Sequence, residues 1–194
     1  VACVVLTCGA RAAVVETQDL ASPRPGSAEA TDLRQIISRA KSEVFPALIF
    51  VKPIVEDYGS GEKKQQEVFG SGVIISADGY AVTNWHVVDK AVTINCVLCD
   101  KRQVPVELIG SDRDTDLALL KLPAPAEGQS YPCARLADGT GLQEGDFVMA
   151  LGSPFGFQRS ISLGIISNAQ RYLGFETDYK YNTWIQTDAA INPG

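Results

Sequence analysis

The chain has 194 residues, of which 45% are hydrophobic, and it carries a formal net charge of −6. This hydrophobic content is enough for the core of one large domain or of two small ones. The negative charge and the lack of a Lys and Arg cluster in the sequence argue against a nucleic-acid-binding surface.

Residues 1–12 are expected to be the remnant of a secretory signal peptide. Residues 1–10 are almost wholly apolar and run into a small-x-small pattern at residues 10–12, which is typical of a cleavage site. Ten apolar residues are too few to cross a bilayer, so we expect an exported protein with no integral membrane span. A buried N-terminal strand is one alternative, because strands also favour Val and Leu. A lipid anchor at Cys3 or Cys8 is another.

The next residues are predicted to form a linker and then a helix. Residues 13–31 contain prolines and polar side chains with little apolar periodicity, which indicates a flexible linker. Apolar residues then recur at helical spacing and predict one amphipathic helix over residues 32–43. Pro46 is expected to close this helix.

From residue 47 onward the pattern is that of short strands. The expected strands cover residues 47–51, 69–76, 79–84, 91–98, 102–110, 117–122, 133–137, 146–151, 160–166 and 182–187. Short strands at this spacing, with few helices, indicate an all-β protein built as a barrel or a sandwich. The break at residues 123–130 divides the series in two.

The cysteines do not suggest a metal or redox site. If Cys3 and Cys8 leave with the signal peptide, the odd set Cys96, Cys99 and Cys133 remains, which is not a disulfide framework. Residues three apart in a strand point to opposite faces, and no second cysteine pair is present to complete a zinc site. We therefore expect neither a metal nor another cofactor.

His86, the only histidine of the chain, is the first candidate catalytic residue. Asp116 stands thirty residues later, directly before the apolar run 117–122. A histidine oriented by a buried carboxylate is two-thirds of a nucleophile-activating triad. Asp112 and Asp114 are alternatives by residue type. Asp116 is favoured because it abuts the apolar strand, where a carboxylate is shielded and can be held rigidly.

The chain resembles the HtrA/Deg family of trypsin-like serine proteases over about residues 44–194. Four motifs in the family's order carry this resemblance: Thr83-Asn84-Trp85-His86-Val87-Val88, Thr115-Asp116-Leu117-Ala118-Leu119-Leu120-Lys121, Ala150-Leu151-Gly152-Ser153-Pro154-Phe155-Gly156 and Ile185-Gln186-Thr187-Asp188-Ala189-Ala190-Ile191-Asn192-Pro193-Gly194. It implies a protease domain at 32–194 with the trypsin-like double β-barrel fold. The first barrel would be complete at about 44–122, and the second, at about 131–194, incomplete.

The resemblance also implies roles for four residues. His86 corresponds to the general base and Asp116 to the carboxylate that orients it. Gly194 corresponds to a residue whose backbone N–H forms part of the oxyanion hole. Ile191 corresponds to a wall of the pocket for the substrate residue before the scissile bond, and favours small or medium apolar side chains there. For Ile191 and Gly194 the alternatives are ordinary core packing and an ordinary turn glycine.

The nucleophile is expected outside the printed sequence. The family pattern places the reactive serine in an Asn-Ser-Gly-Gly motif, two residues after Gly194. Ser71 and Ser153 do not take its place, because neither has the strand-to-helix setting of a nucleophile elbow. We therefore expect the 194-residue chain to be inactive alone, with exposed sheet edges in its second barrel.

The function that the resemblance implies is serine endopeptidase activity. The substrates would be unfolded or misfolded envelope proteins, hydrolysed through an acyl-enzyme in the periplasm or cell envelope without a cofactor. Homotrimers are also implied, with contacts in residues 13–50. The alternative is a non-catalytic peptide-binding pseudoprotease or chaperone on the same scaffold, which would hold extended peptides by strand addition.

Overall fold

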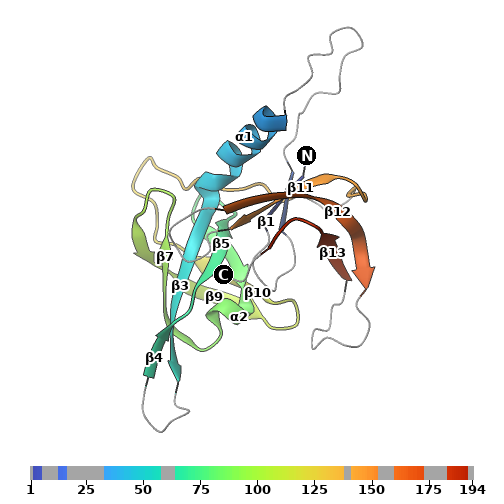
Figure 1. Ribbon diagram of the computed structural model, residues 1–194. Coiled ribbons are helices and arrows are strands. Elements are labelled where there is room, and N and C mark those ends of the chain that lie inside the picture. The colour runs from blue at the N-terminus through green and yellow to red at the C-terminus, as the bar shows by residue number, and fades with distance from the viewer. Residues whose placement is uncertain are drawn as a thin grey trace.

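The protein is mostly β, with a single helix of three turns in the part that the structure describes (Figure 1). The computed structural model describes residues 2–5, 13–16, 33–57, 64–137, 141–152, 160–172 and 183–191. Its helices are α1 (Leu33–Val44), the one-turn α2 (Trp85–Val88) and the 3-10 turn η1 (Phe45–Ala47). The predicted all-β class with a short N-terminal helix is confirmed.

The strands fall into two groups along the chain. They are β1 (Ala2–Val5), β2 (Ala13–Glu16), β3 (Leu48–Asp57), β4 (Lys64–Glu67), β5 (Gly70–Ile74), β6 (Tyr80–Asn84), β7 (Ala91–Val97), β8 (Gln103–Pro105), β9 (Glu107–Asp112), β10 (Leu117–Lys121), β11 (Phe147–Gly152), β12 (Ser160–Tyr172) and β13 (Thr183–Thr187). β3 to β10 form one sheet, and β11 to β13 form a second sheet together with β1 and β2.

Helix α1 is amphipathic and is tied to the first sheet at its C-terminal end. Ala40 and Val44, four residues apart on one face, are 2% and 1% exposed. On the outer face the Arg39 guanidinium lies 3.1 Å from the Glu43 carboxylate, an exposed pair that contributes little to stability. The α-helix ends at Val44, and Pro46 lies in the 3-10 turn that follows, as a proline after a helix favours.

The first sheet closes on itself. Its strand order is β8-β7-β3-β5-β6-β10-β9, and every strand pair is antiparallel. Only Val106 separates β8 from β9, and its N–H donates to the carbonyl of Ile94 in β7 at 3.0 Å. One bent segment therefore pairs with β7 at its start and with β10 at its end. This joins the two edges of the sheet into a barrel, so the predicted first barrel is confirmed.

The interior of this barrel follows the period of two that strands impose. In β10, Ala118 and Leu120 point inward with 2% and 0% exposure, whereas Leu117 is 38% exposed. The barrel interior is one continuous cluster of buried apolar side chains that includes Ile49 and Ile74. Burial of such side chains contributes about 1.5–3 kcal/mol each.

The second sheet is open and curls beside the barrel (Figure 1). Its order is β13-β12-β11-β1-β2. β11 has two buried faces: Met149 and Leu151 belong to the cluster of the first barrel, while Val148 and Ala150 pack with Ile166. Among the described residues this second cluster has four buried members, and partly buried apolar side chains pack against it.

The N-terminal strands correct part of the sequence prediction. β1 lies inside the segment expected to be a signal-peptide remnant and pairs in parallel with β11. β2 occupies residues 13–16, so the linker predicted at 13–31 is wrong over its first four residues. Strand-favouring Val14 and Val15 pair there with β1. Residues 17–31 lie outside the described residues. Helix α1 begins at Leu33, one residue after its predicted start.

Other strand boundaries also differ from the prediction. The strand expected at 133–137 is wrong: this segment is irregular and follows Pro132, which has no N–H for a ladder. It is held instead by a backbone hydrogen bond, in which the Ala134 N–H donates to the carbonyl of Ile74 at 2.8 Å. β3 and β12 are longer than predicted, because they continue in new pairings. β3 pairs with β5 and then β4, and also with β7, whereas β12 pairs with β11 and then β13.

Candidate active site

His86 is placed by a tight hairpin followed by a single helical turn. β5 and β6 pair in register, and the turn between them passes through Gly79 at φ 98°, where a glycine is favoured. α2 begins directly after β6, and its Val87 and Val88 are 4% and 2% exposed. Because these two valines anchor α2 in the barrel core, the His86 side chain stays partly accessible, with 38% exposure.

The hairpin turn is held by an exposed ion pair. Lys121 Nζ lies 2.8 Å from both the carbonyl and the carboxylate of Asp78. The hydrogen bond from Lys121 and a second one from the Ser76 hydroxyl hold the pKa of Asp78 below its usual value. The pair therefore contributes to folding above the unfolded-state pKa of Asp78, and its contribution is lost as the pH falls through the folded-state value.

Asp116 stands at the start of β10 in an uncommon backbone conformation. Its φ is 54°, a left-handed value that few non-glycine residues adopt and that often marks functional sites. The Asp116 carbonyl accepts a 3.1 Å hydrogen bond from the Trp85 N–H, and its own N–H donates to the carbonyl of Arg113 at 3.2 Å. The Asp116 residue is 0% exposed.

The structure brings His86 and Asp116 into direct contact. His86 Nδ1 lies 2.8 Å from Asp116 Oδ2 and 3.0 Å from Oδ1. The backbone N–H of His86 also donates to Oδ1 at 3.0 Å. A carboxylate at Nδ1 favours the tautomer with the proton on that nitrogen, so Nε2 is the nitrogen with a free lone pair. This is the arrangement that a general base requires.

The two alternative carboxylates do not lie in this position. Asp112 is exposed and accepts hydrogen bonds from the Asp114 N–H at 2.9 Å and from the Thr115 hydroxyl at 2.8 Å. It therefore fixes the turn that precedes Asp116. Asp114 is also exposed.

Asn84, which has no predicted role, completes the group. Asn84 is 1% exposed, and its Nδ2 donates at 3.1 Å both to Asp116 Oδ2 and to the Asp116 carbonyl. The sequence signal that could have found it is a polar residue ending an apolar strand two positions before the candidate base. A buried amide needs partners, and the nearby carboxylate is the obvious one.

The segment after β13, which leads to Ile191, is hydrogen-bonded to β12. The Ile165 N–H donates to Asp188 Oδ1 at 2.7 Å, and the Ser162 hydroxyl donates to the Ala190 carbonyl. Gly164 permits this close approach, since a Cβ there would lie 2.3 Å from the backbone nitrogen of Ala189. Ile191 is 42% exposed.

Three further residues from the sequence prediction remain to be placed: Gly194, Ser153 and Ser71. Gly194 and Ser153 lie outside the residues that the structure describes. Ser71 is a half-buried member of β5, and its carbonyl accepts a 2.8 Å hydrogen bond from the Thr83 hydroxyl. Ser71 therefore lies within a strand and not at a strand-to-helix turn.

The structure gives Cys96, Cys99 and Cys133 as free thiols. Cys96 is 0% exposed, and burial raises its pKa to about 12, which makes it unreactive. Cys99 is half-buried and Cys133 is exposed. Among the described residues no group of three or more His, Cys, Asp or Glu side chains could hold a metal ion.

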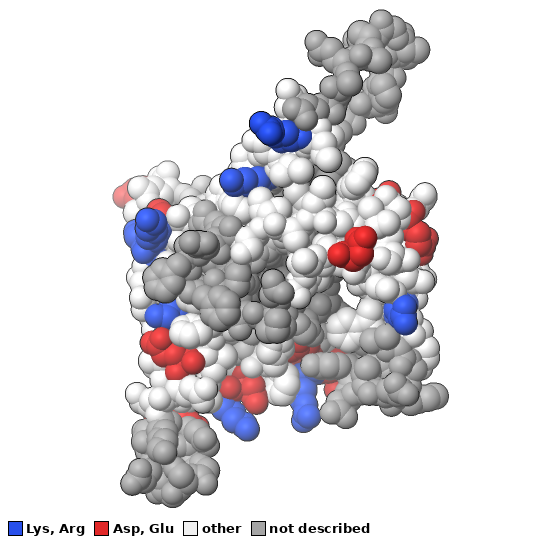
Figure 2. Space-filling view, viewed as in Figure 1, with Lys and Arg blue, Asp and Glu red and all other residues white. Residues whose placement is uncertain are grey.

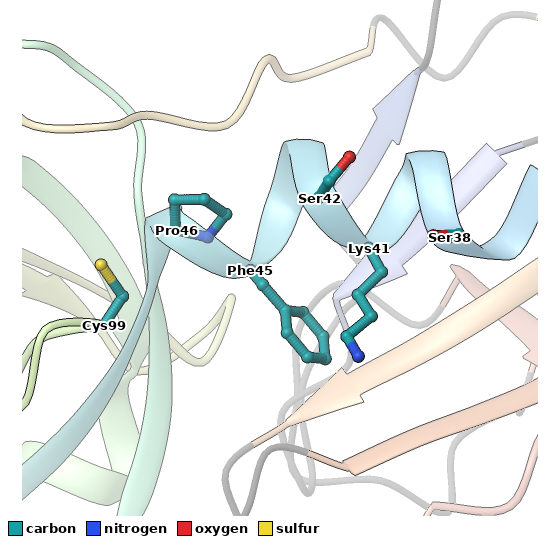
Figure 3. A pocket seen from close by; sticks show the side chains of 6 residues that line it. All are labelled: Ser38, Lys41, Ser42, Phe45, Pro46 and Cys99. Atoms are coloured by element: carbon teal, nitrogen blue, oxygen red, sulfur yellow. The ribbon is translucent and has the colours of Figure 1, made fainter.

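A separate open pocket of about 350 Å³ lies at the junction of α1 and η1 (Figure 3). Its lining consists of Ser38, Lys41, Ser42, Phe45, Pro46 and Cys99. Lys41 Nζ lies 5.4 Å from the centre of the Phe45 ring, which is a cation–π contact. The lining includes neither His86 nor Asp116, so this pocket is distinct from the candidate active site.

Charged side chains are scattered over the face shown in Figure 2. Among the described residues on that face, Lys and Arg side chains are separated by acidic and uncharged ones and form no continuous basic patch (Figure 2). Over the described part of the chain, no helix is long and apolar enough to cross a membrane.

A closed antiparallel barrel, a second curled sheet and a histidine held by a buried carboxylate define a trypsin-like peptidase domain. The model of the trypsin-like peptidase domain family matches residues 70–194. The chain belongs to this family, and within it to the HtrA/Deg group.

Named relatives and a solved structure agree with this assignment. A probable periplasmic serine endoprotease DegP-like from Pseudomonas savastanoi pv. phaseolicola is 44% identical over 137 residues, which cover 70% of this chain and 27% of the relative. The protein of the same description from Pseudomonas putida is 45% identical over 132 residues, which cover 68% and 26%. The solved HtrA-type protease AlgW with tripeptide is 37% identical, with a TM-score of 0.68 and coverage of 81% of this chain and 47% of that one. The chain spans about a quarter of the length of these two curated relatives.

Proposed function

We propose that this chain is the part of an HtrA-type serine endopeptidase that supplies the general base and its orienting carboxylate. The observation that carries the proposal is the 2.8 Å contact between His86 Nδ1 and the fully buried Asp116 carboxylate. In this proposal, His86 Nε2 removes the proton of a nucleophilic serine and later returns it to the leaving amine. Asp116 fixes the ring and stabilises the imidazolium that forms between the two steps.

The other roles follow the family pattern. The nucleophile is the serine of an Asn-Ser-Gly-Gly motif two residues after Gly194, and it forms the acyl-enzyme. The backbone N–H of Gly194 donates to the oxyanion of the tetrahedral intermediate. Ile191 forms one wall of the pocket for the residue before the scissile bond, and its exposed β-branched side chain suits small or medium apolar residues. No cofactor takes part.

The location and substrates are also proposals. Both curated relatives are named as periplasmic serine endoproteases, which supports export to the periplasm or cell envelope. The AlgW structure contains a tripeptide, which supports extended polypeptide as ligand. We infer that the substrates are unfolded or misfolded envelope proteins, and that the protein assembles as a homotrimer through contacts in residues 13–50.

Labelling with a serine-reactive fluorophosphonate tests this function. In the full product of the gene that encodes this chain, we expect covalent labelling of one serine and cleavage of casein. His86→Ala should abolish both. Val92→Ala, at a 51% exposed position in β7, is the matched control and should change neither.

Two outcomes would contradict the proposal. Labelling that is unchanged in His86→Ala would show that the histidine does not activate the serine. A wild-type protein that binds unfolded casein without labelling would support the non-catalytic alternative. The 194-residue chain alone is expected not to cleave casein, so turnover by this chain that depends on His86 would also overturn the account.

A further inference from the structure

We propose that Asn84 is a positioning residue that holds the Asp116 carboxylate in the orientation that His86 needs. This inference rests on the proposed function, because its consequence is measured as proton transfer by His86. Asn84 is a neutral side chain at the end of β6. Neither the family motif nor the residue type specifies that it orients Asp116.

Strand register brings Asn84 and Asp116 together. β6 and β10 are antiparallel, and Asn84 lies opposite Leu117, the residue directly after Asp116. From this position Asn84 Nδ2 reaches both the main-chain carbonyl and Oδ2 of Asp116, each at 3.1 Å. The amide thus joins the backbone and the side chain of one residue, which restricts rotation of the carboxylate relative to its strand.

Burial makes this contact important. Asn84 and Asp116 are 1% and 0% exposed, so water is not available to replace a lost donor. Besides His86, whose N–H and Nδ1 both contact the carboxylate, the donor to Asp116 Oδ2 is Asn84. A buried carboxylate that loses a hydrogen bond bears a large desolvation cost and is free to turn away from the imidazole.

The amide has one defined orientation. Asn84 Oδ1 is buried and has no hydrogen-bond partner within the described part of the chain. The contact with Asp116 therefore orients the amide, since the reversed amide would set its oxygen against two acceptor oxygens. A neutral donor also suits the site, because a Lys or Arg here would compete with the imidazolium for the same negative charge.

The backbone of Asp116 gives Asn84 a second task. At φ 54° this residue occupies an unfavourable region for a non-glycine residue, so its conformation must be held by its surroundings. The Trp85 N–H and Asn84 Nδ2 both donate to the Asp116 carbonyl. Asn84 therefore stabilises the peptide orientation that aims the carboxylate at α2.

Asn84→Leu tests the proposal, since leucine has the same branching and number of side-chain heavy atoms as asparagine but no donor. In the full gene product, we expect kcat for casein cleavage to fall about 10- to 100-fold, the scale of a misplaced catalytic group, while KM stays within about threefold, because Asn84 is buried away from substrate. Thr83→Val is the matched control. Thr83 is the neighbouring residue, 3% exposed, and its hydroxyl bonds the Ser71 carbonyl at 2.8 Å. Its loss should leave kcat within about twofold.

The His86 ring proton gives a readout that does not depend on turnover. In protein labelled with ¹⁵N-histidine, the Nδ1 proton between His86 and Asp116 should give a low-field signal that is absent in His86→Gln. Asn84→Leu should shift or broaden this signal, and Thr83→Val should not. If Asn84→Leu does not fold, as judged by its urea midpoint, Asn84→Ala replaces it with the same expected results.

The outcomes separate this inference from the proposed function. An active wild type with unchanged kcat and an unchanged His86 signal in Asn84→Leu would overturn the role of Asn84 alone. An equal loss of kcat in Thr83→Val would also overturn it, because any buried hydrogen bond on β6 would then suffice. If the wild type fails to label with fluorophosphonate, the proposed function fails, and the His86 signal still decides whether Asn84 orders the pair.

Discussion

The two sheets of this protein solve the problem of exposed strand edges differently. In the first, the segment of β8 and β9 pairs on both sides and closes a barrel around one large apolar cluster. In the second, β11 to β13 form an open curl whose own cluster has four buried residues. Closure removes edges and concentrates burial, so the barrel holds the larger apolar cluster of the described structure.

This difference matches the demands of the two halves of the proposed site. The pair of His86 and Asp116 stands on the barrel, at the ends of strands whose register fixes it within hydrogen-bond distance. Ile191 stands on the second sheet, after a segment held to β12 by a few polar contacts. Proton transfer requires a fixed geometry, whereas a peptide-binding wall tolerates adjustment.

Truncation of a buried side chain in the barrel and of an exposed side chain on the second sheet is the strongest test of this difference. Leu120→Ala should destabilise the 194-residue chain by about 2–5 kcal/mol, because Leu120 is 0% exposed in the barrel cluster. Leu163→Ala, at a 38% exposed position of β12, should change stability by no more than about 0.5 kcal/mol. Urea unfolding measures both, and equal effects would show that the barrel is not the dominant core.

A methyl group on β12 should loosen the second sheet without disturbing the barrel. In Gly164→Ala the new Cβ would lie 2.4 Å from Asp188 Oδ1 and 2.3 Å from the backbone of Ala189, so the segment leading to Ile191 must move. We expect a cost of about 1–3 kcal/mol and a higher KM for casein in the full gene product. Gly110→Ala is the control, since nothing lies within 4 Å of its added Cβ. Wild-type KM in Gly164→Ala would contradict this view of the segment.

Thiol reactivity compares the barrel interior with the segment that leaves it. At pH 9, iodoacetamide should modify exposed Cys133 quickly and buried Cys96 only after unfolding by urea. Burial raises the pKa of Cys96 from 9.0 to about 12, so the folded chain keeps a proton that the unfolded chain releases. Folding stability should therefore decline between about pH 9 and 12, and Cys96→Ala should reduce that decline. Mass spectrometry showing equal rates for the two thiols would mean that the barrel opens readily.

Much of this architecture is predictable because local periodicity and tertiary structure agree. The helix at 32–43, the two strands before His86 and the choice of Asp116 follow from apolar spacing and from the position of a carboxylate beside an apolar strand. The linker predicted at 13–31 was wrong over residues 13–16, because that segment pairs with β1. The strand predicted at 133–137 was wrong, because Pro132 before it has no N–H for a ladder. Asn84 escaped prediction because its role depends on the register of β6 with β10.

A double-mutant cycle on His86 and Asp116 tests the central claim most directly. The rate of fluorophosphonate labelling is measured in the full gene product for wild type, His86→Ala, Asp116→Asn and the double variant. If the two residues act as one unit, Asp116→Asn alone should cost about 10⁴-fold, and the double variant should be no slower than the slower single variant. Effects that multiply in the double variant would show that His86 and Asp116 act independently and would contradict the account.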